Sequence, residues 1–163
     1  GQHAEWDHDG ELEWHLLEDD GHAGVRRWVR DLNRLYAELP ALHARDFGHE
    51  GLEWVEANDA ERSVLSFLRK APDADPVLAV FNLTPEPRTN YRMGVPRSGT
   101  WGEVLNSDAT EYGGSGMGNL GAVKTVPVPY HGRYQSVNLT LPPLSALFLR
   151  GSSRSDDEEG DAA

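Results

Sequence analysis

The sequence predicts a mainly β protein: an antiparallel β-sandwich of about eight strands, of Greek-key type, preceded by one helix. Two observations predict this class. Near the N-terminus, apolar residues recur every three or four positions, as on one face of a helix. Beyond residue 47 they alternate or form short runs separated by turn residues, which is typical of an all-β sandwich.

The helix is predicted over the segment AGVRRWVRDLNRLYAELP. Its arginines and acids occupy one face, and the other face carries an apolar stripe of Val25, Trp28, Val29, Leu32, Leu35, Tyr36 and Leu39. Pro40 ends the helix because a proline displaces the preceding residue from the α region. A lone amphipathic helix must bury its stripe, so we expect it to cover one face of the sandwich or to lack its proper partner.

Strands are expected at 51–56, 63–69, 77–83, 90–95, 100–105, 123–128, 136–141 and 146–149. Turn sequences such as NDAE, APDADP, PEP and RSG separate them. The glycine-rich residues 106–122 have almost nothing to bury, which predicts a long loop whose glycines serve turns. Residues 151–163 are acidic and lack large apolar groups, which predicts a disordered tail.

Composition excludes several function classes. Fifteen Lys and Arg face twenty-seven Asp and Glu, and the net charge of -12 disfavours nucleic acid and anionic membrane surfaces as partners. The absence of cysteine excludes disulfides, thiolate zinc sites and thiol nucleophiles. No apolar run approaches the roughly 20 residues that cross a bilayer. We expect a cytoplasmic protein without a cofactor, and the start at Gly1 without a methionine suggests a piece of a longer chain.

Metal binding is the first hypothesis for the opening stretch GQHAEWDHDGELEWH. His3, His8 and His15 do not have the spacing of a zinc site. An alignment with a calcium loop fails because Leu16 occupies the place of the bidentate glutamate. We therefore expect no metal here.

Two other hypotheses remain for the same stretch. A glycosidase needs two carboxylates several ångströms apart, on either side of the bond that it cleaves. The spacing of Asp7 and Asp9 in the sequence does not establish that distance. Sugar contact suits the composition better. Indole faces stack on pyranose rings, and carboxylates, amides and imidazoles accept or donate hydrogen bonds to hydroxyls. The candidate residues are Gln2, His3, Trp6, Asp7, His8, Asp9 and Trp14, with ordinary packing as the alternative.

The remaining tryptophans raise the same choice between packing and binding. Alternation along the predicted strand places Leu52, Trp54 and Glu56 on one face, which slightly favours Trp54 as a surface platform over a core residue. Trp101 and Trp28 fit a packing role. Ser115 lies in the glycine-rich loop, outside any strand–turn–helix pattern of a phosphate loop or nucleophile elbow.

Several segments together resemble the C-terminal portion of bacterial 1,4-α-glucan branching enzymes of the α-amylase superfamily. They are EWDHDGELEWHLL, HAGVRRWVRDLNRLYAELPALHARDF, FNLTPEPRTNYRMGVPRSGTWGEVLNSDATEYGGSGMGN and HGRYQSVNLTLPPLSALFLR. The resemblance spans about residues 1–150. It implies that 1–46 are the rim loop and closing helix of a catalytic (β/α)8 barrel, and that 47–150 are the all-β domain that follows it.

The resemblance also implies a function. Branching enzymes transfer α-1,4-glucan segments onto 6-hydroxyls to form the α-1,6 branches of glycogen, and their catalytic carboxylates are expected upstream of Gly1, so this chain alone should be inactive. Trp6, His8, Asp9 and Trp14 carry over as rim residues of the glucan cleft, and Trp54 as an external glucan contact. Asp7 stands where the family usually has asparagine. The partners implied are α-glucan and the missing N-terminal and catalytic domains. The alternative is a non-catalytic glucan-binding or structural β-sandwich module.

Overall fold

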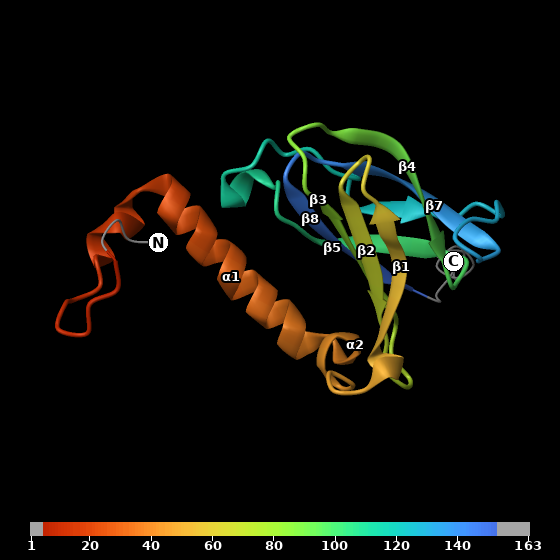
Figure 1. Ribbon diagram of the computed structural model, residues 1–163, viewed down its shortest axis with the longest axis horizontal. Coiled ribbons are helices and arrows are strands. Elements are labelled where there is room, and N and C mark those ends of the chain that lie inside the picture. Colours follow the sequence, from red (N-terminus) through yellow and green to blue (C-terminus); the bar gives the residue numbers. More distant parts are fainter. Residues whose placement is uncertain (1–4, 153–163) are drawn as a thin grey trace, which may run out of the picture.

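The computed structural model describes residues 5–152. Gln2, His3 and nearly all of the predicted acidic tail, residues 153–163, lie outside this range. Helix α1 (Asp20–Glu38) stands beside a β-sandwich, and the residues before it project away from the sandwich (Figure 1). The architecture is therefore the predicted one, a mainly β chain with one long helix at its N-terminal side.

Helix α1 ends where the sequence predicts but begins three residues before the predicted segment. The Asp19 carboxylate accepts hydrogen bonds from the backbone amides of Gly21 and His22 at 2.9 and 3.2 Å, which caps the first turn. Leu39 is the C-cap, and Pro40 follows it. Pro40 also opens a second helix that was not predicted, α2 (Pro40–His43), because a proline is well tolerated at the first helical position.

Within residues 5–152, eight antiparallel strands form two sheets, which confirms the predicted fold class. The larger sheet has the order β1-β2-β3-β8-β5-β6, and the smaller one pairs β4 with β7. The strands are β1 (Leu52–Asp59), β2 (Val64–Arg69), β3 (Val77–Asn82), β4 (Arg88–Val95), β5 (Thr100–Asn106), β6 (Ala122–Lys124), β7 (Gln135–Leu141) and β8 (Ser145–Gly151). Short 3-10 helices cover Trp14–Glu18, His49–Gly51 and Thr110–Tyr112.

The sixth strand is shorter than predicted. The expected strand at 123–128 ends at Lys124, and only an isolated bridge between Val126 and Ser136 continues the pairing. Pro127 and Pro129 explain this difference, because a proline has no amide hydrogen to donate to a neighbouring strand.

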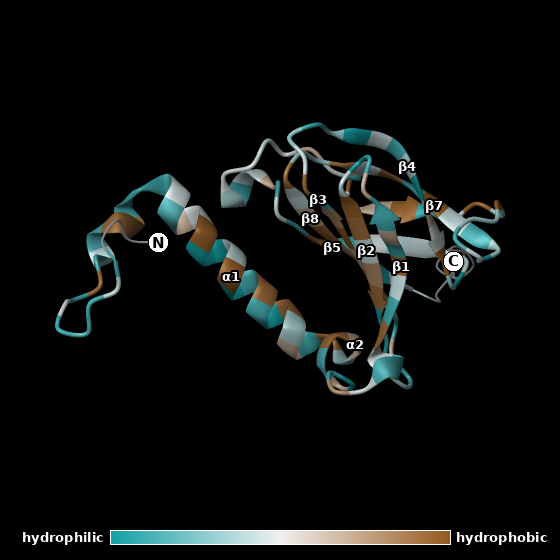
Figure 2. Ribbon diagram, viewed as in Figure 1, coloured by the Kyte–Doolittle hydropathy of each residue, from teal (hydrophilic) through white to brown (hydrophobic). Residues whose placement is uncertain are grey.

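The main core lies between the two sheets. Its side chains are fully buried and include Leu68, Leu78, Met93, Trp101, Leu139 and Leu147. This confirms the packing role of Trp101, and Figure 2 shows the apolar colouring concentrated along these strands. A second, smaller cluster joins Leu35 of α1 to Val77 and Leu105 on the outer face of the larger sheet. In the part of the chain that the structure describes, no helix is long and apolar enough to cross a membrane.

Candidate functional site

Trp54 lies on the surface of the sandwich. It belongs to the edge strand β1, and 56% of its side chain is exposed. The predicted face is correct for Leu52, which is also exposed, but wrong for Glu56. A bulge after Trp54 pairs Trp54 with Phe67 and Glu56 with Ser66, so that Glu56 points to the opposite face. Alternation fails here because the bulge inserts one residue into the strand.

An aromatic row connects Trp54 to helix α1 across the outer face of the larger sheet. The Trp54 ring meets Phe67 edge-on at 5.7 Å, and the Phe67 ring stacks on Phe81 at 5.8 Å. Phe148 continues the row, 6.2 Å from Phe81, and reaches Trp28 of α1 at 6.5 Å. Such ring pairs stabilise by more than their buried area alone. Trp54 is thus an exposed indole that is held in place by its contact with Phe67.

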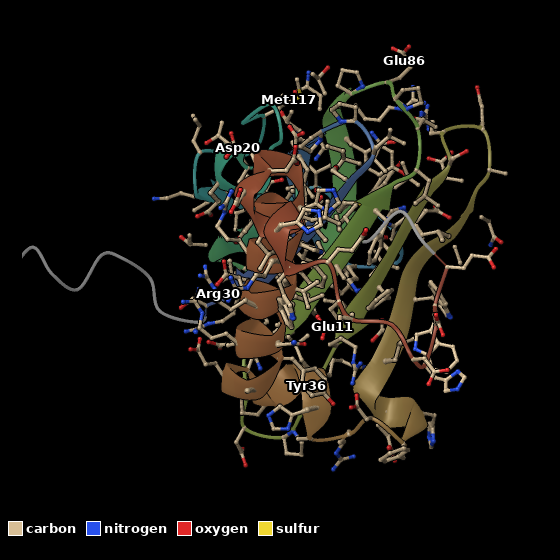
Figure 3. The ribbon with its side chains drawn as sticks, turned by 90° about the vertical axis from the view of Figure 1, so that its left-hand side faces the viewer. Glu11, Asp20, Arg30, Tyr36, Glu86 and Met117 are labelled. Atoms are coloured by element: carbon tan, nitrogen blue, oxygen red, sulfur yellow. The ribbon has the colours of Figure 1, made fainter. Side chains whose placement is uncertain are left out.

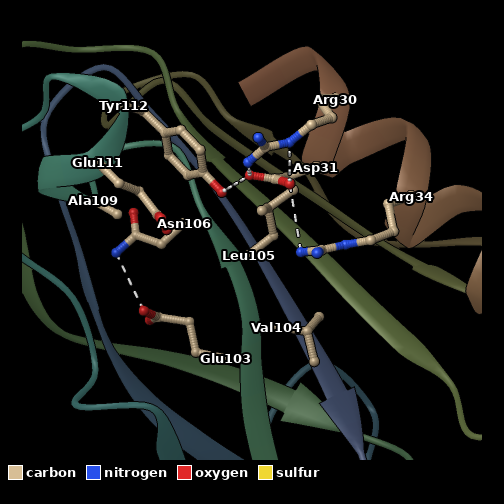
Figure 4. Close-up of a pocket in the computed structure, with 10 residues that line it drawn as sticks. All are labelled: Arg30, Asp31, Arg34, Glu103, Val104, Leu105, Asn106, Ala109, Glu111 and Tyr112. Carbon is tan, nitrogen blue, oxygen red and sulfur yellow. Dashed lines mark hydrogen bonds and ion pairs between the residues drawn. The ribbon is translucent and has the colours of Figure 1, made fainter. Parts of the chain in front are cut away.

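The glycine-rich loop holds α1 against the sheet, which the sequence did not predict. Figure 4 shows Tyr112 of this loop directed at Asp31 of α1, and its hydroxyl donates a 3.0 Å hydrogen bond to that carboxylate. The Tyr112 ring also meets Trp28 edge-on at 5.3 Å. The loop therefore partly buries its only aromatic side chain against the helix, rather than burying almost nothing.

Asp31 is the centre of this junction. Asp31 lies on the face of α1 opposite the apolar stripe, yet only 4% of it is exposed. Arg30 donates two hydrogen bonds to it at 3.0 Å, and Arg34 lies 3.5 Å away. The hydrogen bonds from Arg30 hold the pKa of Asp31 below its usual value, and burial together with Asp31 raises the pKa of Tyr112 to about 12. The junction is a charged network that stays ionised at neutral pH.

A cavity of about 390 Å³ opens beside this network, between α1 and β5 (Figure 4). Its walls are polar and carry both signs of charge, with Arg30 and Arg34 on the helix and Glu103 and Glu111 opposite. Figure 3, in which Arg30 is labelled, shows this side of α1 with the sheets behind it. Hydrogen-bond donors and acceptors together suit a ligand with many hydroxyl groups. However, no tryptophan lines the cavity to offer a surface on which a sugar ring could stack.

Hydrogen bonds between Glu103 and Asn119 tie the loop to β5. The Glu103 carboxylate accepts hydrogen bonds from the Asn119 backbone and side-chain amides at 3.1 and 2.7 Å, and from the Asn106 side chain at 3.2 Å. A Cβ at Gly114 of the same loop would lie 2.2 Å from the backbone carbonyl oxygen of Asp108, so this close approach requires glycine. The glycines of this loop thus permit packing as well as turns.

The predicted rim residues fall into two groups. Trp6, His8 and Asp9 lie in one exposed turn, in which Asp7 accepts a 3.1 Å hydrogen bond from the Asp9 amide. His8 is 3.8 Å from Asp7 and 3.2 Å from Asp9. The potential ligand atoms of Asp7, His8 and Asp9 lie within 4.8 Å of one another. Neither the zinc hypothesis nor the calcium hypothesis combined these three residues. All three are exposed and come from consecutive residues, an arrangement that is common without an ion.

Trp14 lies apart from that turn. It begins the 3-10 helix Trp14–Glu18 and lines an apolar groove of about 360 Å³ formed with Leu12, Leu16 and Leu17 and with Val25 and Val29 of α1. The groove is open, with 68% of Trp14 exposed. Among residues 5–152, Trp6 makes a ring contact with His8 and none with Trp14. The segment before α1, which carries both tryptophans, lies at the opposite end of that helix from β1, the strand of Trp54 (Figure 1).

Comparisons with known proteins identify what the chain is similar to. Residues 54–152 match the family model of the alpha amylase C-terminal all-beta domain. The chain is 61% identical over 149 residues to the 1,4-alpha-glucan branching enzyme GlgB of Aromatoleum aromaticum, covering 91% of this chain and 23% of that protein. It is 60% identical to the GlgB of Albidiferax ferrireducens and 53% identical to that of Aquifex aeolicus, covering 91% and 92% of this chain and 24% of each relative. The chain thus spans about a quarter of the length of the curated relatives that it matches.

Proposed function

Because the chain belongs to the family of alpha amylase C-terminal all-beta domains, we propose that it forms the C-terminal part of a 1,4-α-glucan branching enzyme. The identity of 53% to 61% with branching enzymes over nearly the whole chain supports this proposal. The whole enzyme transfers α-1,4-glucan segments to form α-1,6 branches. In it, residues 1–46 complete the catalytic barrel and the sandwich braces it. The catalytic carboxylates belong to the rest of the enzyme, so this chain alone is inactive, and the enzyme acts in the cytoplasm.

The observation that carries the proposal is the uncovered apolar surface of α1. One side of the helix packs on the sandwich through Leu35, whereas Val25 and Val29 are 55% and 47% exposed. These two valines continue into the groove beside Trp14. A continuous exposed apolar surface of this kind marks an interaction site. The catalytic barrel is the partner that α1 would complete.

The alternative is a free-standing module that binds α-glucan or serves as a structural unit. An exposed Trp54 suits glucan binding under either hypothesis, because indole faces stack on sugar rings. A free-standing module, however, has no use for the groove formed by Trp14 and α1. That groove favours the enzyme over the module.

The proposed glucan contacts follow from the same assignment. Trp6, His8 and Asp9 would line the rim of the glucan cleft from their shared turn, and Trp14 would support that rim from the groove. Trp54 would contact glucan on the outside of the sandwich. In the isolated chain the rim residues are exposed, as groups that meet a cleft formed by other domains would be.

A chimera tests the proposed function. The last quarter of the Aromatoleum aromaticum enzyme would be replaced by this chain, and branching would be followed by the fall in iodine staining of amylose. We expect an active chimera. Changing both Val25 and Val29 to lysine should abolish activity by burying charge at the barrel contact. The matched control is Leu120→Lys, at a fully exposed position on the sandwich loop, which should retain activity.

Two outcomes would count against the proposal. A folded chimera without branching activity would show that this chain cannot serve as the C-terminal part of such an enzyme. Full activity in the double valine variant would show that the exposed side of α1 has no partner in the enzyme.

A further inference from the structure

Helix α1 is attached to the sandwich at two places of different chemistry. Its C-terminal half packs through Leu35 in an apolar cluster, and the Tyr36 hydroxyl donates a hydrogen bond to the Asp46 carboxylate beyond α2. Its N-terminal half meets the 3-10 helix η3 (Thr110–Tyr112) of the glycine-rich loop. Among the described residues, no strand makes as extensive a backbone contact with α1 as η3 does. We call η3 the clip.

The clip holds about two turns of the helix. Arg27 Nε donates a 2.7 Å hydrogen bond to the Glu111 carbonyl, and one turn further on the Tyr112 hydroxyl reaches Asp31 (Figure 4). One turn earlier, a Cβ at Gly24 would lie 2.5 Å from the Tyr112 carbonyl oxygen. Positions 24, 27 and 31 recur every three or four residues and therefore share one face of α1. The clip thus approaches this face more closely than an alanine at position 24 would allow.

The Tyr112 hydroxyl is the link between Asp31 and the sandwich. Arg30 and Arg34, which also contact the Asp31 carboxylate, belong to α1 itself. Among residues 5–152, Tyr112 is therefore the partner of Asp31 that lies outside the helix. A hydrogen bond to an ionised carboxylate is stronger than one between neutral groups. Removal of this one hydroxyl would detach the carboxylate from the sandwich without changing the helix.

The angle of α1 decides where the residues before it lie. We call the exposed turn with Trp6, His8 and Asp9 the rim turn; its chain runs through the 3-10 helix Trp14–Glu18 into the start of α1 (Figure 1). At a rise of about 1.5 Å per residue, Leu35 lies about 24 Å along the axis from the N-cap Asp19. A rotation of about 10° about Leu35 would move the helix start by about 4 Å. Much smaller displacements disturb a binding geometry.

We propose that Tyr112 is a positioning residue for the branching reaction. Its hydrogen bond to Asp31 fixes the angle of α1 and thereby the position of the rim turn at the glucan cleft. This role rests on the proposed function, in which the rim turn contacts glucan. Tyr112 itself touches no substrate. A displaced rim turn weakens contacts that hold the bound glucan throughout the reaction, so the loss should appear in KM rather than in kcat.

The first experiment tests the clip in the chain alone. Amide hydrogen exchange of residues 25–31 would be followed by NMR in the parent chain, Tyr112→Phe and Gly24→Ala. Loss of a hydrogen bond to a carboxylate should speed this exchange at least about tenfold. Gly24→Ala should also speed it, although alanine favours a helix, because its Cβ displaces the clip. The matched control is Tyr134→Phe, which removes a hydroxyl from a side chain that is 86% exposed and should change nothing.

The second experiment measures KM and kcat for amylose in the chimera with the Aromatoleum aromaticum enzyme. Tyr112→Phe and Gly24→Ala should each raise KM about fivefold or more, which corresponds to the loss of about one hydrogen bond to glucan, with little change in kcat. Tyr134→Phe should leave both constants unchanged. A variant that is merely less stable would contain less active enzyme, which lowers the apparent kcat and leaves KM as it was.

Two results would overturn the proposal directly. Unchanged exchange in Tyr112→Phe would show that the clip does not hold α1. Faster exchange with an unchanged KM would show that the clip is a structural contact without a role at the cleft. An inactive parent chimera would instead refute the proposed function, and the role in branching with it. The exchange experiment on the chain alone would still show whether the clip holds the helix, so the two failures are distinguishable.

Discussion

Replacement of Leu35 by alanine measures how firmly α1 is docked on the sandwich. Leu35 is 8% exposed and packs in the cluster that contains Val77 of β3 and Leu105 of β5. Truncation of a buried leucine to alanine destabilises by about 2–5 kcal/mol, because apolar contact is lost and a cavity remains. A contact between a helix and a sheet can partly close over such a cavity, so we expect the lower part of that range, about 2–3 kcal/mol.

That free energy corresponds to a measurable change in melting temperature. A domain of this size loses about 2–4 °C per kcal/mol, so Leu35→Ala should lower the melting temperature by about 4–12 °C. The assay is thermal unfolding followed by circular dichroism, with urea unfolding followed by tryptophan fluorescence, to which Trp28 at the same contact contributes. Alanine itself favours a helix, so any loss comes from packing and not from helix propensity.

The matched control is Val29→Ala on the uncovered side of the same helix. Val29 is 47% exposed, and surface substitutions away from packed features usually stay within about 0.5 kcal/mol. If Leu35→Ala and Val29→Ala shift the melting temperature equally, α1 is not docked through Leu35. In that case the separation into a docked and an uncovered side of the helix would be wrong.

Two further predictions concern the sandwich. Trp54→Ala should reduce the retardation of the chain in native gels that contain glycogen. The control is Tyr134→Ala, which removes another exposed aromatic side chain of the sandwich. Equal retardation of the parent chain and both variants would exclude Trp54 as a glucan contact. Burial lowers the pKa of His131 despite the neighbouring Glu56, so the unfolded chain binds this proton more readily and stability should fall as the pH drops below about 6.5. Urea unfolding at pH 5 to 7 should show a smaller loss for His131→Gln than for the exposed control His49→Gln, and equal losses would contradict the burial of a neutral His131.

The sequence was most informative where local periodicity decides the structure. The stripe containing Leu35 and the strand patterns predicted α1 and the two sheets, because burial of one face imposes a regular spacing. It was least informative where distant segments meet. The burial of Asp31 depends on Tyr112, which lies 81 residues later, and no local pattern predicts that pairing. Tyr112, the one aromatic residue of the segment 106–122, was the available signal.

The candidate sites show the same division. The exposure of Trp54 agrees with the face expected from alternation, since the bulge comes after it. The orientation of Glu56 could not be predicted, because an inserted residue reverses every later side chain until the register is restored.

The irregular edges of the larger sheet bear on how the protein behaves at high concentration. Its two outermost strands are β1, which carries two breaks of register, and β6, which has only three residues. A long, flat edge strand would offer a row of unpaired backbone N–H and C=O groups to another chain. Bulges and short strands interrupt that row, so another strand cannot pair along it. The larger sheet can therefore keep exposed apolar side chains such as Trp54 for specific contacts without promoting strand-by-strand aggregation between copies.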